Sequence, residues 1–342
     1  MRKIDDLSFE ELKEVLLKNN EPKFKANQIF DWIHNKTVDS FDSMTNVSQK
    51  TKTELKREYE FTLATIELKL ESKLDETKKY VIKFEDGNIV ESVFLKYKFG
   101  NTACISSQVG CKMGCHFCAS TKNGFIRNLT AVEMLKQIYL IQKDLSEKIS
   151  NVVIMGSGEP LENFDNIVKF LNIINDEKGQ NISMRKITLS TSGIVPNIYK
   201  LADENIPITL AISLHAPTQE KREQIMPIAR KYKLSDILKA CDYYVSTTGR
   251  RLTFEYIMIK GFNDSQEDAL TLSKILKNKL ANVNLIPCNY VKEANIKPSG
   301  NLDIEKFKKV LSDNGINATV RRELGSDINA ACGQLRNDLL KM

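Results

Sequence analysis

Three cysteines lie close together in the segment Cys111-Lys-Met-Gly-Cys115-His-Phe-Cys118. Iron–sulfur clusters are usually held by four cysteine thiolates, so a set of three leaves one iron without a protein ligand. An iron with an open position can bind a substrate, by the same logic that separates catalytic metal sites from structural ones. Gly110 and Gly114 allow the backbone to wrap closely around such a group. The spacing therefore predicts a catalytic cluster with these three cysteines as its ligands.

A structural zinc site of three cysteines and one histidine is the alternative interpretation of the same segment. His116 would be the fourth ligand, but it lies between two of the cysteines, where a tight loop makes simultaneous coordination awkward. The sequence has no second Cys-x-x-Cys pair that would complete a four-cysteine site. We therefore favour iron, and a zinc-dependent RNA-binding protein without catalysis remains the alternative from a different functional class.

Small polar residues follow several of the expected strands, at positions where a ligand could be held. Gly158 and Glu159 follow the strand expected at residues 151–155, and Glu159 could accept hydrogen bonds from an ammonium group. Any single such position is equally compatible with an ordinary cap or turn. Because ligands in open α/β folds bind outside the carboxyl ends of strands, several positions together indicate one pocket. The others are Ser190, Ser213, Leu214, His215 and Asn289.

The elements that would position these residues alternate between strand and helix patterns from residue 102 onward. Such alternation is typical of a parallel sheet with crossover helices. The repeated units are too few for a closed eight-fold barrel, so we expect an α/β fold with a partial barrel. Strands are expected at residues 102–106, 151–155, 186–190, 207–213, 252–259, 282–287 and 317–321. Helices are expected at residues 130–144, 163–176, 194–204, 234–247, 265–279 and 302–313.

The chain divides into three parts by its patterns. Residues 1–60 have apolar residues at helical spacing and are expected to form a small helical accessory domain. Residues 61–100 contain β-forming segments around a Gly-containing turn and are expected to form a small antiparallel β extension. Residues 101–342 are expected to form the partial barrel, together with a polar C-terminal loop that contains Cys332.

The composition is that of a soluble globular protein, since 42% of the 342 residues are hydrophobic and 27% are charged. The net charge of +6 permits a polyanionic partner such as nucleic acid without requiring one. The N-terminal segment lacks the apolar region of a signal peptide, and no apolar stretch is long enough to span a bilayer. We expect a cytoplasmic protein, in which seven cysteines indicate metal binding or catalysis rather than a disulfide framework.

Several segments resemble one known family. The Cys-x3-Cys-x2-Cys spacing, with Phe117 before the last cysteine, is similar to that of radical S-adenosylmethionine (SAM) enzymes. Longer segments resemble the RlmN-type adenine methyltransferases over nearly the whole chain, namely FKANQIFDWI, CISSQVGC, MGSGEP, LSTSGIVP, AISLHAP, MPIARKY and VRRELGSDINAACGQL. The resemblance implies a partial (β/α)6 radical SAM barrel, a [4Fe–4S] cluster, and two SAM molecules per turnover as methyl donor and radical source. It also implies methylation of carbon 2 of adenosine in 23S ribosomal RNA and in the anticodon loop of tRNA.

The resemblance further implies roles for individual residues. Cys332 corresponds to the cysteine that is methylated on sulfur and then forms a covalent bridge to the RNA base. Cys104 corresponds to the cysteine that resolves this bridge by forming a disulfide with Cys332, and Glu91 corresponds to the proton acceptor. The polar residues at the strand ends correspond to SAM contacts. From its local pattern alone, Glu91 would be an exposed residue on a surface strand.

One close alternative is a carbon-8 adenine rRNA methyltransferase that confers antibiotic resistance, since it shares the key cysteines. The GEPL, MPIARKY and RRELGSD segments favour carbon 2. The expected partners are 23S rRNA, tRNA and a reducing electron donor such as flavodoxin or ferredoxin, and the default expectation is a monomer without membrane association. Basic residues that could contact the RNA backbone, or simply be solvated surface charges, are Lys221, Arg222, Arg230, Lys231, Lys233, Arg321 and Arg322.

Overall fold

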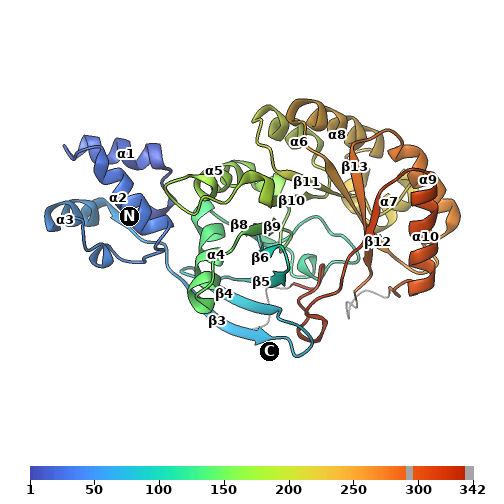
Figure 1. The fold of residues 1–342 in the computed structure, drawn as a ribbon, viewed down its shortest axis with the longest axis horizontal. Coiled ribbons are helices and arrows are strands. Elements are labelled where there is room, and N and C mark those ends of the chain that lie inside the picture. The colour runs from blue at the N-terminus through green and yellow to red at the C-terminus, as the bar shows by residue number, and fades with distance from the viewer. Residues whose placement is uncertain (290–295, 336–342) are drawn as a thin grey trace.

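The structure, a computed structural model, describes residues 1–289 and 296–335. Its first part is helical and forms a lobe at one end of the molecule (Figure 1). A capping box between Ser8 and Glu11 begins the first helix, and the Ser48 side chain caps the third. The apolar sides of these helices are buried, which fixes the lobe as a packed unit. The elements are β1 (Arg2–Lys3), α1 (Phe9–Lys18), α2 (Phe24–His34), α3 (Gln49–Glu58) and β2 (Tyr59–Glu60).

One large sheet runs through the rest of the described chain, in the order β14-β13-β12-β11-β10-β9-β6-β5-β4-β3. The strands from β6 to β14 in this order pair in parallel, so each needs a crossover connection. Every strand and helix expected from residue 102 onward is present. The parallel strands are β6 (Gly100–Ile105), β9 (Asn151–Ile154), β10 (Ile187–Thr191), β11 (Thr209–Ser213), β12 (Leu252–Met258), β13 (Ala281–Pro287) and β14 (Ala318–Val320).

The crossover helices lie on the outer side of the curved sheet, as Figure 1 shows for α6, α8, α9 and α10. Their apolar residues and those of the strands form one continuous core. None of the helices in the described residues combines the length and apolar character that crossing a membrane requires. The helices are α4 (Ala131–Leu145), α5 (Phe164–Asn175), α6 (Val195–Asp203), α7 (Gln219–Ile225), α8 (Leu234–Thr248), α9 (Gln266–Leu276) and α10 (Asn301–Asp313).

The antiparallel segment is part of the same sheet rather than a separate small sheet. Strand β5 pairs with β6 and places Val93 opposite Cys104, so the antiparallel strands continue the edge of the parallel sheet. This arrangement covers an edge of β6 that would otherwise expose unpaired backbone groups. The antiparallel strands are β3 (Ala64–Glu71), β4 (Lys78–Phe84) and β5 (Ile89–Tyr97), and a separate hairpin joins β7 (Gln108–Gly110) to β8 (Phe125–Asn128).

The two faces of this antiparallel region have different neighbours. Side chains alternate between faces along a strand, and directly paired residues share a face. Tyr80 and Val90 belong to the main core, which also contains residues of α4. Val93 and Cys104 lie on the opposite face and pack against Leu335 of the C-terminal segment. The C-terminal segment therefore covers the face of the sheet that α4 leaves open.

Candidate active site

The loop between β7 and β8 carries Cys111, Cys115 and Cys118 and is called the cluster loop below. The pairing of β7 with β8 closes this loop at its base. The N–H of Cys111 donates to the carbonyl of Gly124, with 2.9 Å between N and O. Gly110 has a φ of +73°, and a Cβ there would lie 1.9 Å from the Gly124 oxygen, so only glycine fits without a backbone shift. The thiols of Cys111, Cys115 and Cys118 all line one cavity of about 150 Å³ at the carboxyl ends of the parallel strands.

No three histidine, cysteine or carboxylate side chains in residues 1–289 and 296–335 converge closely enough to hold a single metal ion. An iron–sulfur cluster does not need such convergence, because each cysteine binds a different iron. His116, the fourth ligand of the zinc alternative, is exposed and does not line the cavity. Three thiols around a shared cavity therefore fit a cluster better than a zinc ion.

Burial raises the pKa of all three cluster cysteines, to about 12 for Cys111. The metal-free thiols are therefore protonated at neutral pH, and binding of a cluster must release their protons. Met113 and Phe117 add apolar surface to the cavity wall. An apolar wall limits the access of water to a cluster, which is one of the ways in which a protein tunes it.

The Glu159 carboxylate is buried, and three donors hold it at the wall of this cavity. Its Oε1 accepts from the N–H of Leu161 at 3.0 Å and the hydroxyl of Thr191 at 2.7 Å. Its Oε2 accepts from the N–H of Ser192 at 2.6 Å. Burial raises the pKa of Glu159, while these hydrogen bonds act in the opposite direction. The remaining lone pair of Oε2 is suited to accept from the ammonium group of a ligand.

Gly158, Ser190 and Ser213 line the same cavity. At Gly158 the φ is +109° and a Cβ would lie 2.6 Å from the Cβ of Gln108, so the loop packs tightly on β7. The hydroxyls of Ser190 and Ser213 lie 3.3 Å apart on neighbouring strands. Leu214 is different, because its side chain is buried in the core and does not line the cavity. The side chain of Leu214 has a packing role, and a contact of this position with SAM stays a prediction.

His215 is a neutral ring with a defined tautomer. Its Nδ1 accepts from the N–H of Ile257 at 3.1 Å, so the ring proton lies on Nε2. Burial, with a contribution from Arg222, lowers the pKa of His215 to about 3. The ring lines the cavity and meets Phe117 edge-on, with 4.7 Å between centroids. His215 therefore offers a single hydrogen-bond donor, Nε2–H, to a bound ligand.

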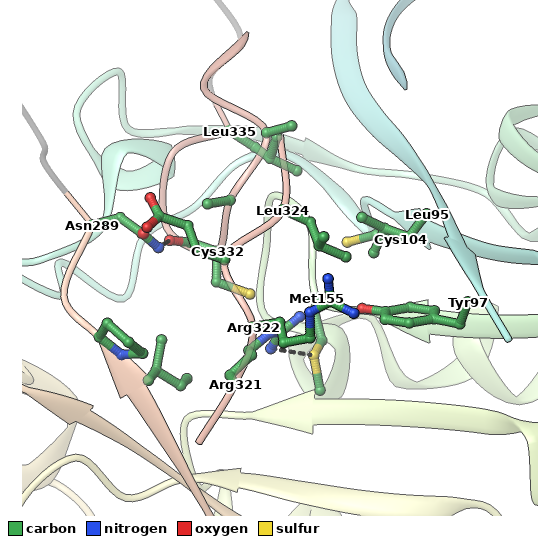
Figure 2. A pocket seen from close by; sticks show the side chains of 15 residues that line it. Leu95, Tyr97, Cys104, Met155, Asn289, Arg321, Arg322, Leu324, Cys332 and Leu335 are labelled. Atoms are coloured by element: carbon green, nitrogen blue, oxygen red, sulfur yellow. Dashed lines mark hydrogen bonds between the residues drawn. The ribbon is translucent and has the colours of Figure 1, made fainter. Parts of the chain in front are cut away.

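A second cavity of about 40 Å³, whose lining Figure 2 shows, shares Met155, Arg321 and Cys332 with the first. Cys104 and Cys332 both line it, although they come from strand β6 and from the C-terminal loop. Cys332 also lines the cluster cavity, so it lies at the junction of the two. All seven cysteines of the chain are free in the structure. The fold thus brings together the cluster cysteines and the two cysteines singled out from the C-terminal and β6 motifs.

Asn289 lines the second cavity rather than the cluster cavity. Its Nδ2 donates to the carbonyl of Cys332 at 2.9 Å. This hydrogen bond fixes the backbone of Cys332. The role of Asn289 as a SAM contact stays a prediction.

The C-terminal loop is held by hydrogen bonds to three other parts of the chain. The Asp327 carboxylate accepts from the Ser72 hydroxyl at 2.7 Å and from the N–H of Lys73 at 2.8 Å. The N–H of Ala119, in the cluster loop, donates to the carbonyl of Gly333 at 2.7 Å. The turn between β3 and β4, the cluster loop and Asn289 therefore set the position of Cys332 together.

Glu91 is fully buried, which contradicts the exposed position that its local pattern suggests. Its Oε1 lies 3.4 Å from the Nζ of Lys79, and Lys79 donates to the carbonyl of Asn329 in the C-terminal loop at 3.2 Å. Glu91 lies two residues before Val93, the partner of Cys104, and so shares the face of the sheet that carries Cys104. It lines neither cavity. The local pattern failed because the covering segment lies far away in the sequence.

Arg321 lines both cavities, next to Cys332. Its Nη1 lies 3.7 Å from the Sδ of Met155 and 4.0 Å from the Oε2 of Glu255. Burial raises the pKa of Cys332, and the nearby Arg321 guanidinium lowers it. Figure 2 shows Tyr97 and Met155 at the same cavity. Sequence reasoning missed these last two residues, although Met155 begins the MGSGEP segment.

The basic residues considered for RNA contact have different environments. Lys221 and Arg222 are neighbours on α7, and successive helical residues point in directions about 100° apart. Lys221 is partly exposed and pairs with Asp268 at 2.6 Å, whereas Arg222 is fully buried. Arg222 cannot contact RNA in this structure, which corrects the interpretation of it as a surface charge. Arg230 and Lys231 are exposed.

Comparison with known proteins matches two family models. Residues 105–272 match the Radical SAM superfamily, and residues 3–61 match the ribosomal RNA large subunit methyltransferase N-terminal domain. The solved structure of a radical SAM methyltransferase from Sphaerobacter thermophilus is 38% identical, with a TM-score of 0.93 over 98% of this chain and 99% of that one. This likeness confirms the predicted α/β fold with a radical SAM barrel.

Curated relatives match over the full length. A probable dual-specificity RNA methyltransferase RlmN of Clostridium novyi (strain NT) is 53% identical and covers 100% of this chain and 99% of its own length. The corresponding protein of Clostridium botulinum (strain Eklund 17B / Type B) is 54% identical and covers 100% of this chain and 98% of its own length. Together with the cysteine geometry, these matches show that the chain belongs to the RlmN family of radical SAM RNA methyltransferases.

Proposed function

We propose that this radical SAM enzyme methylates carbon 2 of adenosine in 23S rRNA and in the anticodon loop of tRNA, with Cys332 and Cys104 as its reacting thiols. The observation that carries the proposal is the position of Cys332 at the junction of two cavities. One cavity holds the three cluster cysteines, and the other holds Cys104. A group carried on the sulfur of Cys332 can therefore be reached from the cluster side and from the Cys104 side.

The residues present fit the cofactors of the family. Cys111, Cys115 and Cys118 would hold a [4Fe–4S] cluster, and Glu159 and His215 would orient SAM through a carboxylate acceptor and an Nε2–H donor. When bound, these groups supply a methyl group and the ability to remove a hydrogen atom from an unactivated carbon. This chemistry suits the substrate, because carbon 2 of adenine is electrophilic and cannot be methylated by ordinary displacement.

The chain's own residues carry the methyl group to the base. The sulfur of Cys332 accepts the methyl group after losing its thiol proton, and the Arg321 guanidinium beside it favours the thiolate. The methyl carbon then joins Cys332 to carbon 2 of the adenine. This coupling takes one hydrogen atom from the methyl group, and then one proton and one electron from the adduct. The cluster, when bound, would supply the acceptor for that electron. Glu91 is proposed to take the proton from carbon 2, and its support is its buried position on the face that carries Cys104.

Cys104 completes the cycle. Its thiolate attacks the sulfur of Cys332, so that a sulfur–sulfur bond forms while the bond between Cys332 and the methyl carbon breaks. The electron pair of the broken bond goes to the carbon on the base, which takes up a proton and leaves as the methylated product. The resulting transient disulfide is reduced by an external thiol. We propose flavodoxin or ferredoxin as electron donor for the cluster, and a cytoplasmic monomer as the acting form.

The decisive experiment is nucleoside mass spectrometry of RNA incubated with anaerobically reconstituted enzyme and SAM. We expect 2-methyladenosine in both 23S rRNA and tRNA. If the product were 8-methyladenosine, found in rRNA alone, the enzyme would be the antibiotic-resistance methyltransferase instead. Protein that bound zinc, took up no iron and left RNA unmodified would support the non-catalytic RNA binder.

A further inference from the structure

Arg222 is the largest fully buried side chain among the described residues. It lies on α7, and this helix backs the cluster loop, because the N–H of His116 donates to the carbonyl of Ile225 at 3.0 Å. A buried charge is costly unless an opposite charge and hydrogen bonds compensate for it. The chemistry described above gives this residue no role, so the charge needs another physical reason.

Hydrogen bonds fix the guanidinium but do not neutralise it. Its Nη2 donates to the carbonyls of Ser192 and Ser213, which end the strands that line the cluster cavity. Its Nε and Nη1 are buried and have no hydrogen-bond acceptor within residues 1–289 and 296–335. Carbonyl groups are neutral, so these contacts orient the cation without supplying an anion.

The nearest anion would be the cluster and its ligands. Ser192 and Ser213, whose carbonyls hold the Arg222 guanidinium, line the same cavity as Cys115. Cysteines bind iron as thiolates, so a bound cluster brings negative charge into the cavity against which Arg222 is packed. Arg222 therefore gains a counter-charge when the cluster binds.

We propose that Arg222 is a positioning residue whose charge stabilises the reduced form of the iron–sulfur cluster. An oxidised [4Fe–4S] core of charge +2 with three thiolates has a net charge of −1, and one electron from the donor makes it −2. A fixed cation nearby stabilises the second state more than the first, and therefore raises the reduction potential. This role rests on the cluster site proposed above, but not on which RNA carbon is methylated.

The test is an anaerobic redox titration of the reconstituted full-length protein, with the reduced cluster followed by electron paramagnetic resonance. Arg222→Gln removes the charge and keeps an N–H donor for the carbonyls, whereas Arg222→Lys keeps the charge. Arg230→Gln is the matched control, because it removes an exposed charge from the segment that follows α7. We expect Arg222→Gln to disfavour reduction about tenfold, a fall of about 59 mV for a one-electron couple, and the other two variants to match wild type.

Equal midpoint potentials in all four proteins would overturn the proposal, since Arg222 would then only tie together the ends of β10 and β11. If Arg222→Gln retained no iron, thermal unfolding of the metal-free proteins would decide. The metal-free variant should be at least as stable as metal-free wild type, because it lacks an uncompensated buried charge. A clear loss of stability in the metal-free variant would mean that Arg222 has a purely structural role.

Two further outcomes separate this proposal from the proposed function. Wild-type protein that took up no iron would overturn both. An altered potential in Arg222→Gln, in an enzyme that does not methylate RNA, would overturn the proposed function alone.

Discussion

The two cysteines that we propose as reacting thiols line one cavity but have different packing neighbours. Cys332 lies beside the Arg321 guanidinium, whose positive charge favours its thiolate. Cys104 packs among Val93 and Leu95, and burial raises its pKa to about 12. A thiol next to a cation is the better nucleophile at neutral pH. Burial raises the pKa of both thiols, and Arg321 acts against burial at both. The assignment of Cys332 as the first thiol to react therefore rests on its position at the junction of the two cavities.

Replacing Cys104 by alanine should trap the enzyme on its substrate. The bond between Cys332 and the base can form without Cys104, but no other cysteine lines the cavity to break it. We expect covalent protein–RNA adduct to accumulate and turnover to fall by more than about a hundredfold, as seen on denaturing gels and by nucleoside analysis. Cys241→Ala is the control, because Cys241 lies on the buried side of α8, and this variant should form no adduct. Normal turnover by Cys104→Ala would refute the resolving role.

Release of the RNA from this intermediate should become faster as the pH rises. Because the pKa of Cys104 is raised to about 12, mainly by burial, only a small fraction is thiolate at neutral pH. Below its pKa, the thiolate fraction grows tenfold for each pH unit. Single-turnover release rates measured by rapid quench should therefore rise about tenfold from about pH 7 to 8 and again from about pH 8 to 9. A rate that is constant over this range would mean that another step or another nucleophile limits release.

At the scale of elements, short irregular segments position the chemistry and the sheet supports them. The β7–β8 hairpin closes the cluster loop, and the turn between β3 and β4 holds the C-terminal loop through Asp327. Strands β5 and β6 place Glu91 and Cys104 on one face beneath that loop. A defect in any of these connections should therefore disturb the site while leaving the parallel sheet intact.

Gly110→Ala tests the hairpin. The new Cβ would lie 1.9 Å from the Gly124 oxygen at a φ of +73°, so the backbone of the cluster loop must move. We expect reconstituted protein to lose most of its iron and its visible absorbance, with little change in far-ultraviolet circular dichroism. Gly124→Ala is the matched control, because it has a φ of +70° but no atom within 4 Å of the Cβ. This substitution should lower the free energy of unfolding by only about 1–2 kcal/mol, and the variant protein should keep its iron. Equal iron content in both variants would contradict the steric argument.

At the scale of the whole molecule, the site is assembled from parts that lie far apart in the sequence. The helical lobe occupies one end of the molecule (Figure 1). The two cavities are lined by residues of the parallel strands, of the antiparallel strand β5 and of the C-terminal loop. The net charge of +6 is spread over the chain, and several lysines and arginines of the barrel are exposed. Long-range attraction to RNA is therefore a property of the surface as a whole.

Binding of RNA should accordingly weaken with salt. If about three phosphates are contacted, affinity for tRNA should fall roughly twentyfold to fortyfold between about 50 and 200 mM salt. Fluorescence anisotropy with labelled tRNA and metal-free protein measures this directly, without interference from turnover. Arg230→Gln, which removes an exposed charge, should reduce the salt dependence of the affinity. Arg222→Gln should leave the salt dependence unchanged, because Arg222 is buried. An affinity that does not change with salt would rule out a phosphate-based interaction.

The sequence by itself determined most elements of the parallel sheet, the cluster motif and the family, whereas helix α7 and the β7–β8 hairpin were not predicted. These are local or repeated signals, such as the spacing of Cys111, Cys115 and Cys118, and the alternation of strand and helix patterns from residue 102 onward. These signals can be recognised in short segments of the sequence, because hydrophobic periodicity and ligand spacing involve residues that are close together along the chain. Longer motifs pointed to Cys104 and Cys332 only through resemblance to relatives.

Only the tertiary structure decided which side chains are buried and which are exposed to solvent. Glu91 and Arg222 read as surface charges along the sequence, yet both are fully buried, by a C-terminal loop and by the ends of neighbouring strands. The structure also shows packing that the sequence did not indicate, because the Leu214 side chain lies in the core and Asn289 holds the backbone of Cys332. Burial depends on contacts between distant segments, and single-sequence patterns carry no information about those contacts.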